Sequence, residues 1–123
     1  MFKAWKTFTF QLVCALKRSP RWYSLRRRVL RGANGCEACA AMTGLQVHHV
    51  KPVYTHPELE LDPQNLMVLC ARCHLHIGHG GCWTRVNPMA RDSAATLKAN
   101  PLLKATVWSI ARKVSIRMIH RAA

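Results

Sequence analysis

The stretch Cys36-Glu-Ala-Cys39 and its counterpart Cys70-Ala-Arg-Cys73 decide the fold of this chain. Each is a Cys-x2-Cys knuckle, and two such pairs supply the four thiolates of a tetrahedral zinc site. Four protein ligands leave no position open for water, so the predicted zinc is structural. The 30 residues between the pairs are more than a short zinc ribbon contains. The site is therefore predicted to clamp the two ends of a larger unit.

The same cysteines admit two other interpretations, which are less favoured. Cys70-Ala-Arg-Cys73-His74 also matches the Cys-x2-Cys-His pattern of haem attachment. That interpretation leaves Cys36 and Cys39 unexplained, and haem attachment normally goes with export. A redox dithiol is disfavoured because no strand-helix-strand pattern surrounds the pairs. Cys14 and Cys82 belong to no pattern and are interpreted as buried or free thiols.

Between the knuckles, the sequence predicts two short strands joined by a long loop. Thr43-Gly44 is a turn signal before the strand at 45–50, and the apolar run 66–69 leads directly into the second cysteine pair. Prolines among polar residues in 52–64 indicate a loop. After the second pair, a brief helix is predicted that Gly78 ends.

The flanks of the chain are predicted to be helical. Residues 21–31 follow Ser19, the expected N-cap, and precede Gly32, the expected stop. Apolar residues recur on one face of this helix and arginines lie mostly on the other. Residues 8–16 are interpreted as an amphipathic helix rather than a signal peptide. Helices are also expected at 91–99 and 102–119, with a break at Asn100-Pro101.

Charge separates the chain into three parts. The formal net charge is +14, from 19 Lys+Arg against 5 Asp+Glu, which points to a polyanion and first to nucleic acid. We expect a basic N-terminal helical arm at 1–35, a core at 36–82 and a basic C-terminal helical tail at 83–123. The core has more acidic than basic residues, which suits metal cations. The tail is equally compatible with a packed helix and with direct phosphate contact.

Polar residues with catalytic potential lie inside the clamp: His48-His49, Asn65 and His74. Adjacent residues on a strand point to opposite faces, so His48 and His49 are expected to have separate roles. One imidazole would bind a metal ion while its neighbour addresses a water molecule, as metal-assisted phosphodiester hydrolysis requires.

The motifs, in their order along residues 21–87, resemble the HNH endonuclease family. They are Cys36-x2-Cys39, Val47-His-His-Val-Lys-Pro52, Asn65-Leu-Met-Val-Leu-Cys70 and Cys70-x2-Cys73-His74. The resemblance implies a ββα-metal core. The predicted fold class is therefore α+β, with this core clamped by the four-cysteine zinc site and flanked by basic N- and C-terminal helices. Gly78-His-Gly-Gly81, Trp83 and Asn87-Pro88 further resemble a phage-associated branch of the family.

The resemblance also implies a role for each site residue. His49 corresponds to the general base, His48 to the first ligand of a catalytic ion and His74 to the second. Asn65 corresponds to the middle letter of the motif, which either orients the catalytic loop or ligates the metal. His79 is a rival or additional ligand. The predicted DNA contacts are Arg26, Arg27, Arg28 and Arg72.

The expected function is metal-dependent cleavage of DNA that leaves 5′-phosphate and 3′-hydroxyl ends. The catalytic ion is distinct from the zinc and is Mg²⁺, Mn²⁺, Ni²⁺, Co²⁺ or Zn²⁺, with imidazole ligands favouring the transition metals. DNA is the expected partner, and no membrane segment is predicted. The phage branch implies packaging partners (terminase, portal) and the cytoplasm of a bacterium or infected host. The alternative is a zinc-dependent DNA-binding module without catalysis.

Overall fold

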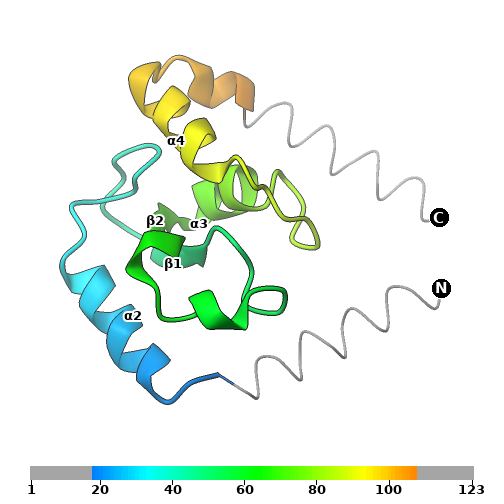
Figure 1. Ribbon diagram of the computed structural model, residues 1–123. Helices are drawn as coiled ribbons and strands as arrows, with labels where there is room; N and C mark the ends of the chain where they lie inside the picture. Colours follow the sequence, from blue (N-terminus) through cyan, green and yellow to red (C-terminus); the bar gives the residue numbers. More distant parts are fainter. Residues whose placement is uncertain (1–17, 108–123) are drawn as a thin grey trace, which may run out of the picture.

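The computed structural model describes residues 18–107. The helix expected at 8–16, and the part of the last helix beyond residue 107, lie outside the described residues. The elements follow in the order α2 (Arg21–Arg31), β1 (Leu45–His49), η1 (Pro57–Leu59), η2 (Pro63–Asn65), β2 (Leu66–Cys70), α3 (Ala71–Cys73), η3 (His74–Gly78) and α4 (Ala90–Ala99). Figure 1 shows the two strands at the centre with the helices around them. This is the α+β fold that the sequence predicted.

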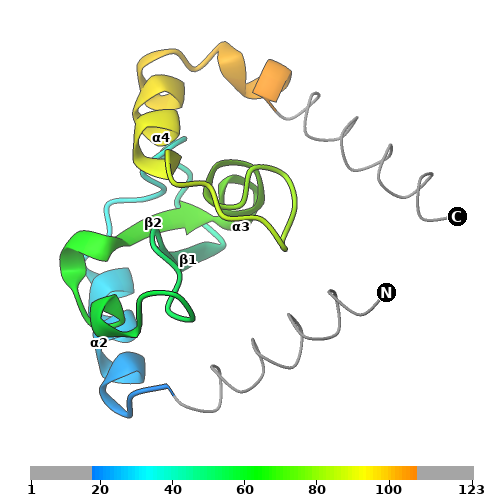
Figure 2. The same ribbon diagram turned by 45° about the vertical axis from the view of Figure 1, so that its right-hand side comes forward.

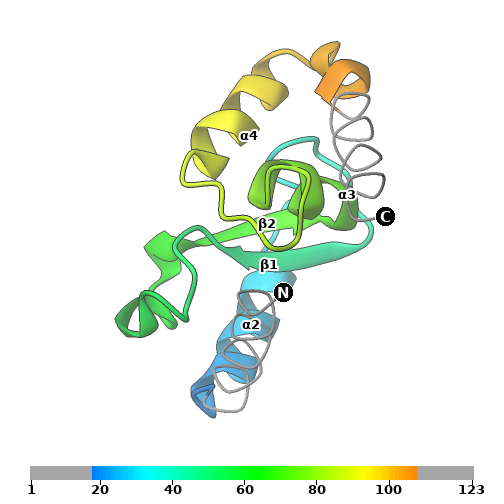
Figure 3. The ribbon, with the colours of Figure 1, turned by 90° about the vertical axis from the view of Figure 1, so that its right-hand side faces the viewer.

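The two strands pair antiparallel in a register that separates two faces. Leu45 lies opposite Cys70, Val47 opposite Val68 and His49 opposite Leu66. Because side chains alternate along a strand, Val47 and His49 share one face while His48 lies on the other. Figure 3 shows α2 on one side of the sheet and α3 and α4 on the other. The sheet is therefore the middle layer of three.

Helix α2 covers one face of the sheet and has the predicted bounds. Trp22 and Leu25 are buried with Val47 and Leu66 in an apolar cluster. The N-cap position is taken by Pro20, one residue later than expected, and Pro20 makes no side-chain cap bond. Ser19 still caps the first turn, because its Oγ accepts the Arg21 N–H at 3.3 Å and its carbonyl accepts the Trp22 N–H at 2.9 Å. A proline at this position loses no hydrogen bond, since the first N–H groups of a helix have no partner inside it.

The other face of the sheet is covered by α3, η3 and α4. All five residues of β2 are buried. Met67 and Leu69 pack in the larger apolar cluster together with Ala94 and Leu97 of α4. Turning the molecule by 45° shows α4 on the side of β2 that faces away from α2 (Figure 2). The helix expected at 91–99 is thus confirmed, begins at Ala90, and is part of the core that holds the cysteines.

The second edge of β2 is closed by side chains instead of a third strand. The Val68 N–H donates to Glu37 Oε1 at 2.7 Å, and the Glu37 N–H donates to the Val68 carbonyl at 2.9 Å. Arg91 of α4 donates to the Leu66 carbonyl at 2.9 Å and lies 3.9 Å from the Glu37 carboxylate. These bonds satisfy an edge that would otherwise expose unpaired backbone groups.

The helix that follows β2 begins earlier than expected, and its second part is a wider π-helix. It starts at Ala71 and runs to Gly78, the predicted end, but from His74 it has π-helical hydrogen bonding. The N–H of His79 donates to the His74 carbonyl, five residues back, at 3.1 Å. Single π turns are frequent at functional sites. In the part of the chain that the structure describes, no helix is long and apolar enough to cross a membrane.

The turn before the first knuckle provides a stability test. Gly35 has φ +106°, and a Cβ there would lie 2.9 Å from Met42 Sδ and 3.1 Å from the Ala40 carbonyl oxygen. We expect Gly35→Ala to lower the free energy of unfolding by roughly 2–5 kcal/mol, a backbone cost of about 1–2 plus a steric cost of about 1–3. Denaturant titration measures this loss.

Gly44→Ala is the matched control, because Gly44 has φ +64° and open space around it. Gly44→Ala should lower the free energy of unfolding only by the backbone cost of about 1–2 kcal/mol. Equal losses in the two variants would contradict the predicted crowding at Gly35.

Candidate functional site

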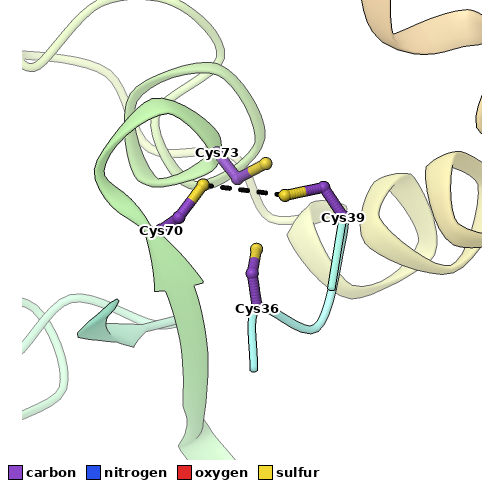
Figure 4. A group of neighbouring side chains, drawn as sticks. All are labelled: Cys36, Cys39, Cys70 and Cys73. Carbon is purple, nitrogen blue, oxygen red and sulfur yellow. Dashed lines mark hydrogen bonds between the residues drawn. The ribbon is translucent and has the colours of Figure 1, made fainter. Parts of the chain in front are cut away.

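The four cysteines of the two knuckles meet in space. Their sulfur atoms all lie within 4.8 Å of one another, and none forms a disulfide (Figure 4). Cys39 Sγ and Cys70 Sγ are 3.7 Å apart. A tetrahedron with Zn–S bonds of about 2.3 Å has edges of about 3.8 Å. The cluster therefore fits the predicted structural zinc.

The local backbone holds the first knuckle in place. The Cys36 N–H donates to the Ala41 carbonyl and the Ala40 N–H donates to the Cys36 carbonyl, both at 2.8 Å. Ala40 takes φ 60°, which lets the chain reverse direction after the knuckle. Lys104, after α4, donates to the Cys39 carbonyl at 3.2 Å. The knuckle is thus held by local backbone bonds and by one contact from a residue remote in sequence.

Without a metal ion, burial holds two of the four thiols in the protonated form. Burial raises the pKa of Cys73 far above the usual thiol value, with the neighbouring cysteines adding to the effect. Burial also raises the pKa of Cys39. A zinc ion reverses this balance, because its charge stabilises thiolates and binding releases their protons. The donor set and its burial are consistent with a site that is complete only with the metal.

A second cluster consists of three imidazoles. His48 of β1, His74 of η3 and His79, which follows η3, each offer one ring nitrogen, and these atoms lie within 4.8 Å of one another. The ring centroids of His48 are 5.0 Å from His74 and 5.1 Å from His79. Residues five apart on an α-helix point about 140° away from each other. The π turn is wider and brings His74 and His79 to one side.

Each imidazole has a nitrogen available for an ion. His74 Nδ1 donates to Gln46 Oε1 at 2.6 Å, and His79 Nδ1 donates to the Arg85 carbonyl at 2.8 Å. These bonds leave Nε2 of both rings as an acceptor, which is the usual arrangement of metal-binding histidines. His48 Nε2 is buried and has no hydrogen-bond partner among the described residues. Such an orphaned nitrogen is costly unless it binds a cation.

Two of the imidazoles, those of His48 and His74, are held neutral. Burial lowers the pKa of His48 to about 3, with His74 and His79 adding to the effect. Burial lowers the pKa of His74 to about 4, again with His79 contributing. Only neutral imidazole binds a metal ion. The protein therefore keeps His48 and His74 ready for an ion at neutral pH.

His49 lies on the opposite face of β1, as strand geometry predicted. Its Nε2 donates to the Glu60 carbonyl at 2.9 Å, and its ring lies 4.5 Å from the Trp22 ring. Burial lowers the pKa of His49, an effect that the Glu60 carbonyl opposes and the charge of Arg18 reinforces. With Nε2 protonated to meet the carbonyl, Nδ1 is the nitrogen that can accept a proton.

Glu60 also connects His49 to the start of α2. Its side chain is buried, and both carboxylate oxygens accept the backbone N–H of Ser19 at 3.2 Å. One residue therefore contacts both the imidazole and the chain that leads into the basic helix.

Asn65 is committed to the backbone of the loop between the strands. Its Oδ1 accepts the Lys51 N–H at 2.8 Å, and its Nδ2 donates to the Lys51 carbonyl at 2.9 Å and to the Leu59 carbonyl at 3.4 Å. Of the two roles that the resemblance left open, this geometry corresponds to orienting the loop. Asn65 is not part of the imidazole cluster.

A cavity of about 310 Å³ joins the two histidine faces. Both His48 and His49 line it because β1 ends at His49 and the cavity wraps around that end. Its other walls are Arg18, Val47, Pro52, Val53, Tyr54, His74, His79, Trp83, Thr84, Arg85 and Val86. His74 and His79, which the sequence treated as possible rivals, thus lie in one site.

The predicted DNA contacts lie elsewhere on the surface. Arg26, Arg27 and Arg28 are exposed on α2, and Arg72 is exposed on α3. None of the four lines the cavity, whereas Arg18 and Arg85 do. In the sequence, Arg18 and Arg85 belong to no motif and contribute only to the total charge. Their positions follow from long-range packing.

Gln46 is a further site residue that no sequence motif indicated, and Gly78, predicted as a helix end, has a second role at the site. A Cβ at Gly78 would lie 3.0–3.2 Å from three atoms of the His48 ring. The absence of a side chain at Gly78 therefore lets His48 reach the cluster. Gln46 precedes His48 by two residues on β1, so both side chains lie on one face of the strand. That alternation is the signal that would have identified Gln46.

Comparison with known proteins gives one match. The family model described as HNH endonuclease matches residues 36–80, which include both cysteine pairs, both strands and all three imidazoles of the cluster. Neither a curated protein nor a solved structure matches this chain.

The lowered pKa of His48 predicts how stability depends on pH. Its pKa is about 3 in the folded protein against 6.5 ordinarily. Below about pH 6.5 the unfolded chain binds a proton that the folded chain does not, so the free energy of unfolding should fall as the pH drops. Denaturant titrations between pH 7 and 5.5, with one zinc per chain and no added ion, measure this slope. His48→Gln should have a shallower slope than wild type, and equal slopes would contradict the prediction.

Gly78→Ala tests the packing under His48. The new methyl group should displace the His48 ring and weaken binding of Co²⁺ or Mn²⁺ at the cluster by about 10–100-fold, the usual effect of disturbing a ligand's support. Calorimetry measures the affinity, and circular dichroism checks the fold. Gly32→Ala is the control, since Gly32 has φ −84° and a Cβ there makes only ordinary contacts of 3.6 Å or more, outside the cluster. Unchanged affinity in Gly78→Ala would mean that His48 is not a ligand.

Proposed function

We propose that this chain, whose residues 36–80 match the HNH endonuclease family, cleaves phosphodiester bonds of DNA. His48, His74 and His79 would hold a catalytic ion, and His49 would act as the general base. The observation that carries the proposal is that one cavity contains a cluster of three imidazoles and, around the end of β1, a fourth imidazole with a free Nδ1.

His49 is suited to deprotonate the attacking water. The Glu60 carbonyl fixes the ring and its tautomer, and it stabilises the imidazolium that forms after proton transfer. The lowered pKa keeps the base unprotonated at neutral pH. Asn65 supports this arrangement, because its bonds to Lys51 and Leu59 hold the loop that carries Glu60.

The ion would offset negative charge that builds up on the phosphate in the transition state. Three imidazoles favour Zn²⁺, Ni²⁺, Co²⁺ or Mn²⁺ over Mg²⁺, which prefers oxygen ligands. His79 would therefore be a third ligand of the ion, beside the predicted ligands His48 and His74. The structural zinc of the cysteines would have no part in the chemistry, since four thiolates leave no open position.

Two sets of arginines would bind the DNA. Arg18 and Arg85 line the cavity and would contact the phosphates nearest the ion. Arg26, Arg27, Arg28 and Arg72 are exposed outside it and would extend the contact along the backbone. A net charge of +14 favours such binding.

The division of the chain and its biological setting are proposals that rest on the sequence. They comprise a basic arm at 1–35, a nuclease core at 36–82 and a basic tail at 83–123. They also include phage DNA packaging beside terminase and portal, in the cytoplasm of a bacterium or infected host. The resemblance of Gly78-His-Gly-Gly81 and Trp83 to a phage-associated branch supports this setting.

Plasmid nicking separates the roles of the adjacent histidines. His49→Ala should lose about 10²–10⁴ in rate, the usual contribution of a general base, and excess ion should not restore it. His48→Ala should lose activity through weaker ion binding and recover part of it as Mn²⁺, Co²⁺ or Ni²⁺ is raised at constant ionic strength. His56→Ala is the control, because His56 pairs with Glu58 and lies outside the cluster and the cavity.

Two outcomes would contradict this assignment. Rescue of His49→Ala by excess ion would show that the two roles are exchanged. A wild-type protein that binds plasmid but nicks it with none of these ions would leave the zinc-dependent DNA-binding module as the better interpretation.

A further inference from the structure

A large indole at the cavity has no part in the proposed hydrolysis. Trp83 is 55% exposed and forms one wall of the cavity. Its ring centroid lies 5.3 Å from that of His74 and 5.1 Å from that of His79. More than half of this apolar side chain therefore faces solvent directly beside the candidate ion site.

The loop that carries Trp83 is held at several points. Gly80 and Gly81 have φ +59° and +85°, which turn the chain back toward the imidazoles. The Cys82 N–H donates to the His79 carbonyl at 3.3 Å, and the Arg85 N–H donates to the Cys82 carbonyl at 2.9 Å. Farther along, Asn87 Nδ2 donates to the Ile77 carbonyl at 2.7 Å. The indole is thus presented by a fixed turn.

The rest of the cavity has the chemistry of a site for an unpaired nucleotide. Arg18 and Arg85 supply positive charge, while Pro52, Val53 and Val86 supply apolar surface. Cationic grooves with aromatic side chains are characteristic of proteins that bind single strands. A volume of about 310 Å³ is at the lower end of the range for small-molecule sites, which suits one nucleotide rather than a duplex.

We propose that Trp83 stacks on an unpaired nucleobase beside the scissile phosphate, so that the preferred substrate is DNA that is single-stranded or locally unpaired at the cut. The position of the phosphate rests on the proposed nuclease function, since it is placed by the imidazole cluster. In a duplex, each base is already stacked between its neighbours and must be extruded before it can meet the indole. That cost disfavours fully paired DNA at this site.

The binding test compares three DNA probes of one sequence, each labelled with 2-aminopurine. The probes are a single strand, a full duplex and a duplex with one unpaired nucleotide. Titrations are made without added divalent ions, so that the zinc stays bound and the strand is not cut. We expect Trp83→Leu to weaken binding of the single strand and the unpaired probe by roughly 5–150-fold, the usual value of one base-aromatic stack. Duplex affinity should change little. Trp83→Phe should keep part of the affinity.

Tyr23→Leu is the matched control for loss of an exposed aromatic ring. Tyr23 is 65% exposed on α2 and does not line the cavity. It should bind all three probes as wild type does. Because Trp83 and Tyr23 are both exposed, neither variant should unfold, and circular dichroism checks this.

The outcomes distinguish this inference from the nuclease function. Equal loss for duplex and single strand, or no loss for either, would overturn the stacking role. Weaker Co²⁺ binding in Trp83→Leu with unchanged DNA affinities would also overturn it, because the ring would then only shield the imidazoles. A wild-type protein that binds unpaired DNA through Trp83 but nicks no probe with any ion would support the stacking and contradict the nuclease function.

Discussion

The four-thiolate clamp is the constraint on which the rest of the structure depends. It joins two segments 30 residues apart, and each is continuous with part of the functional site. Glu37, inside the first knuckle, closes the edge of β2, and His74 directly follows the last cysteine. Structural zinc contributes roughly 10–16 kcal/mol of apparent binding free energy, as much as the whole net stability of a typical domain. Loss of the zinc would therefore release both the sheet and the imidazole cluster.

The two faces of a very short sheet divide the work of the site. His48 points to the face covered by α3 and α4, where burial and two other imidazoles lower its pKa. His49 points to the face covered by α2, where a carbonyl oxygen controls its tautomer. The end of the strand lets both reach one cavity. A longer β1 would keep the two side chains on separate faces, so the end of the strand is what brings both to the cavity.

Local patterns predicted much of this arrangement, and long-range contacts account for the rest. The cysteine spacing, the alternation of β1 and the breaks at Gly32 and Gly78 gave the clamp, the strands and the helix ends. The π turn was not predictable, because the period of an α-helix separates His74 from His79 and no residue type announces the wider turn. Arg18, Gln46 and Arg85 were missed for a related reason. Their positions depend on which segments pack together, which a motif does not record.

Glu60 links the chain ahead of α2 to His49 through a single residue. Ser19 and Glu60 are 41 residues apart in sequence, yet one buried carboxylate bridges them, and the carbonyl of the same residue holds His49. A pull on the chain ahead of α2 reaches the imidazole through a single amino acid. This link limits how another domain can be fused to the protein. A new recognition domain fused on the N-terminal side requires a linker long enough to leave the Ser19 N–H bound to Glu60, because tension there would displace the His49 ring.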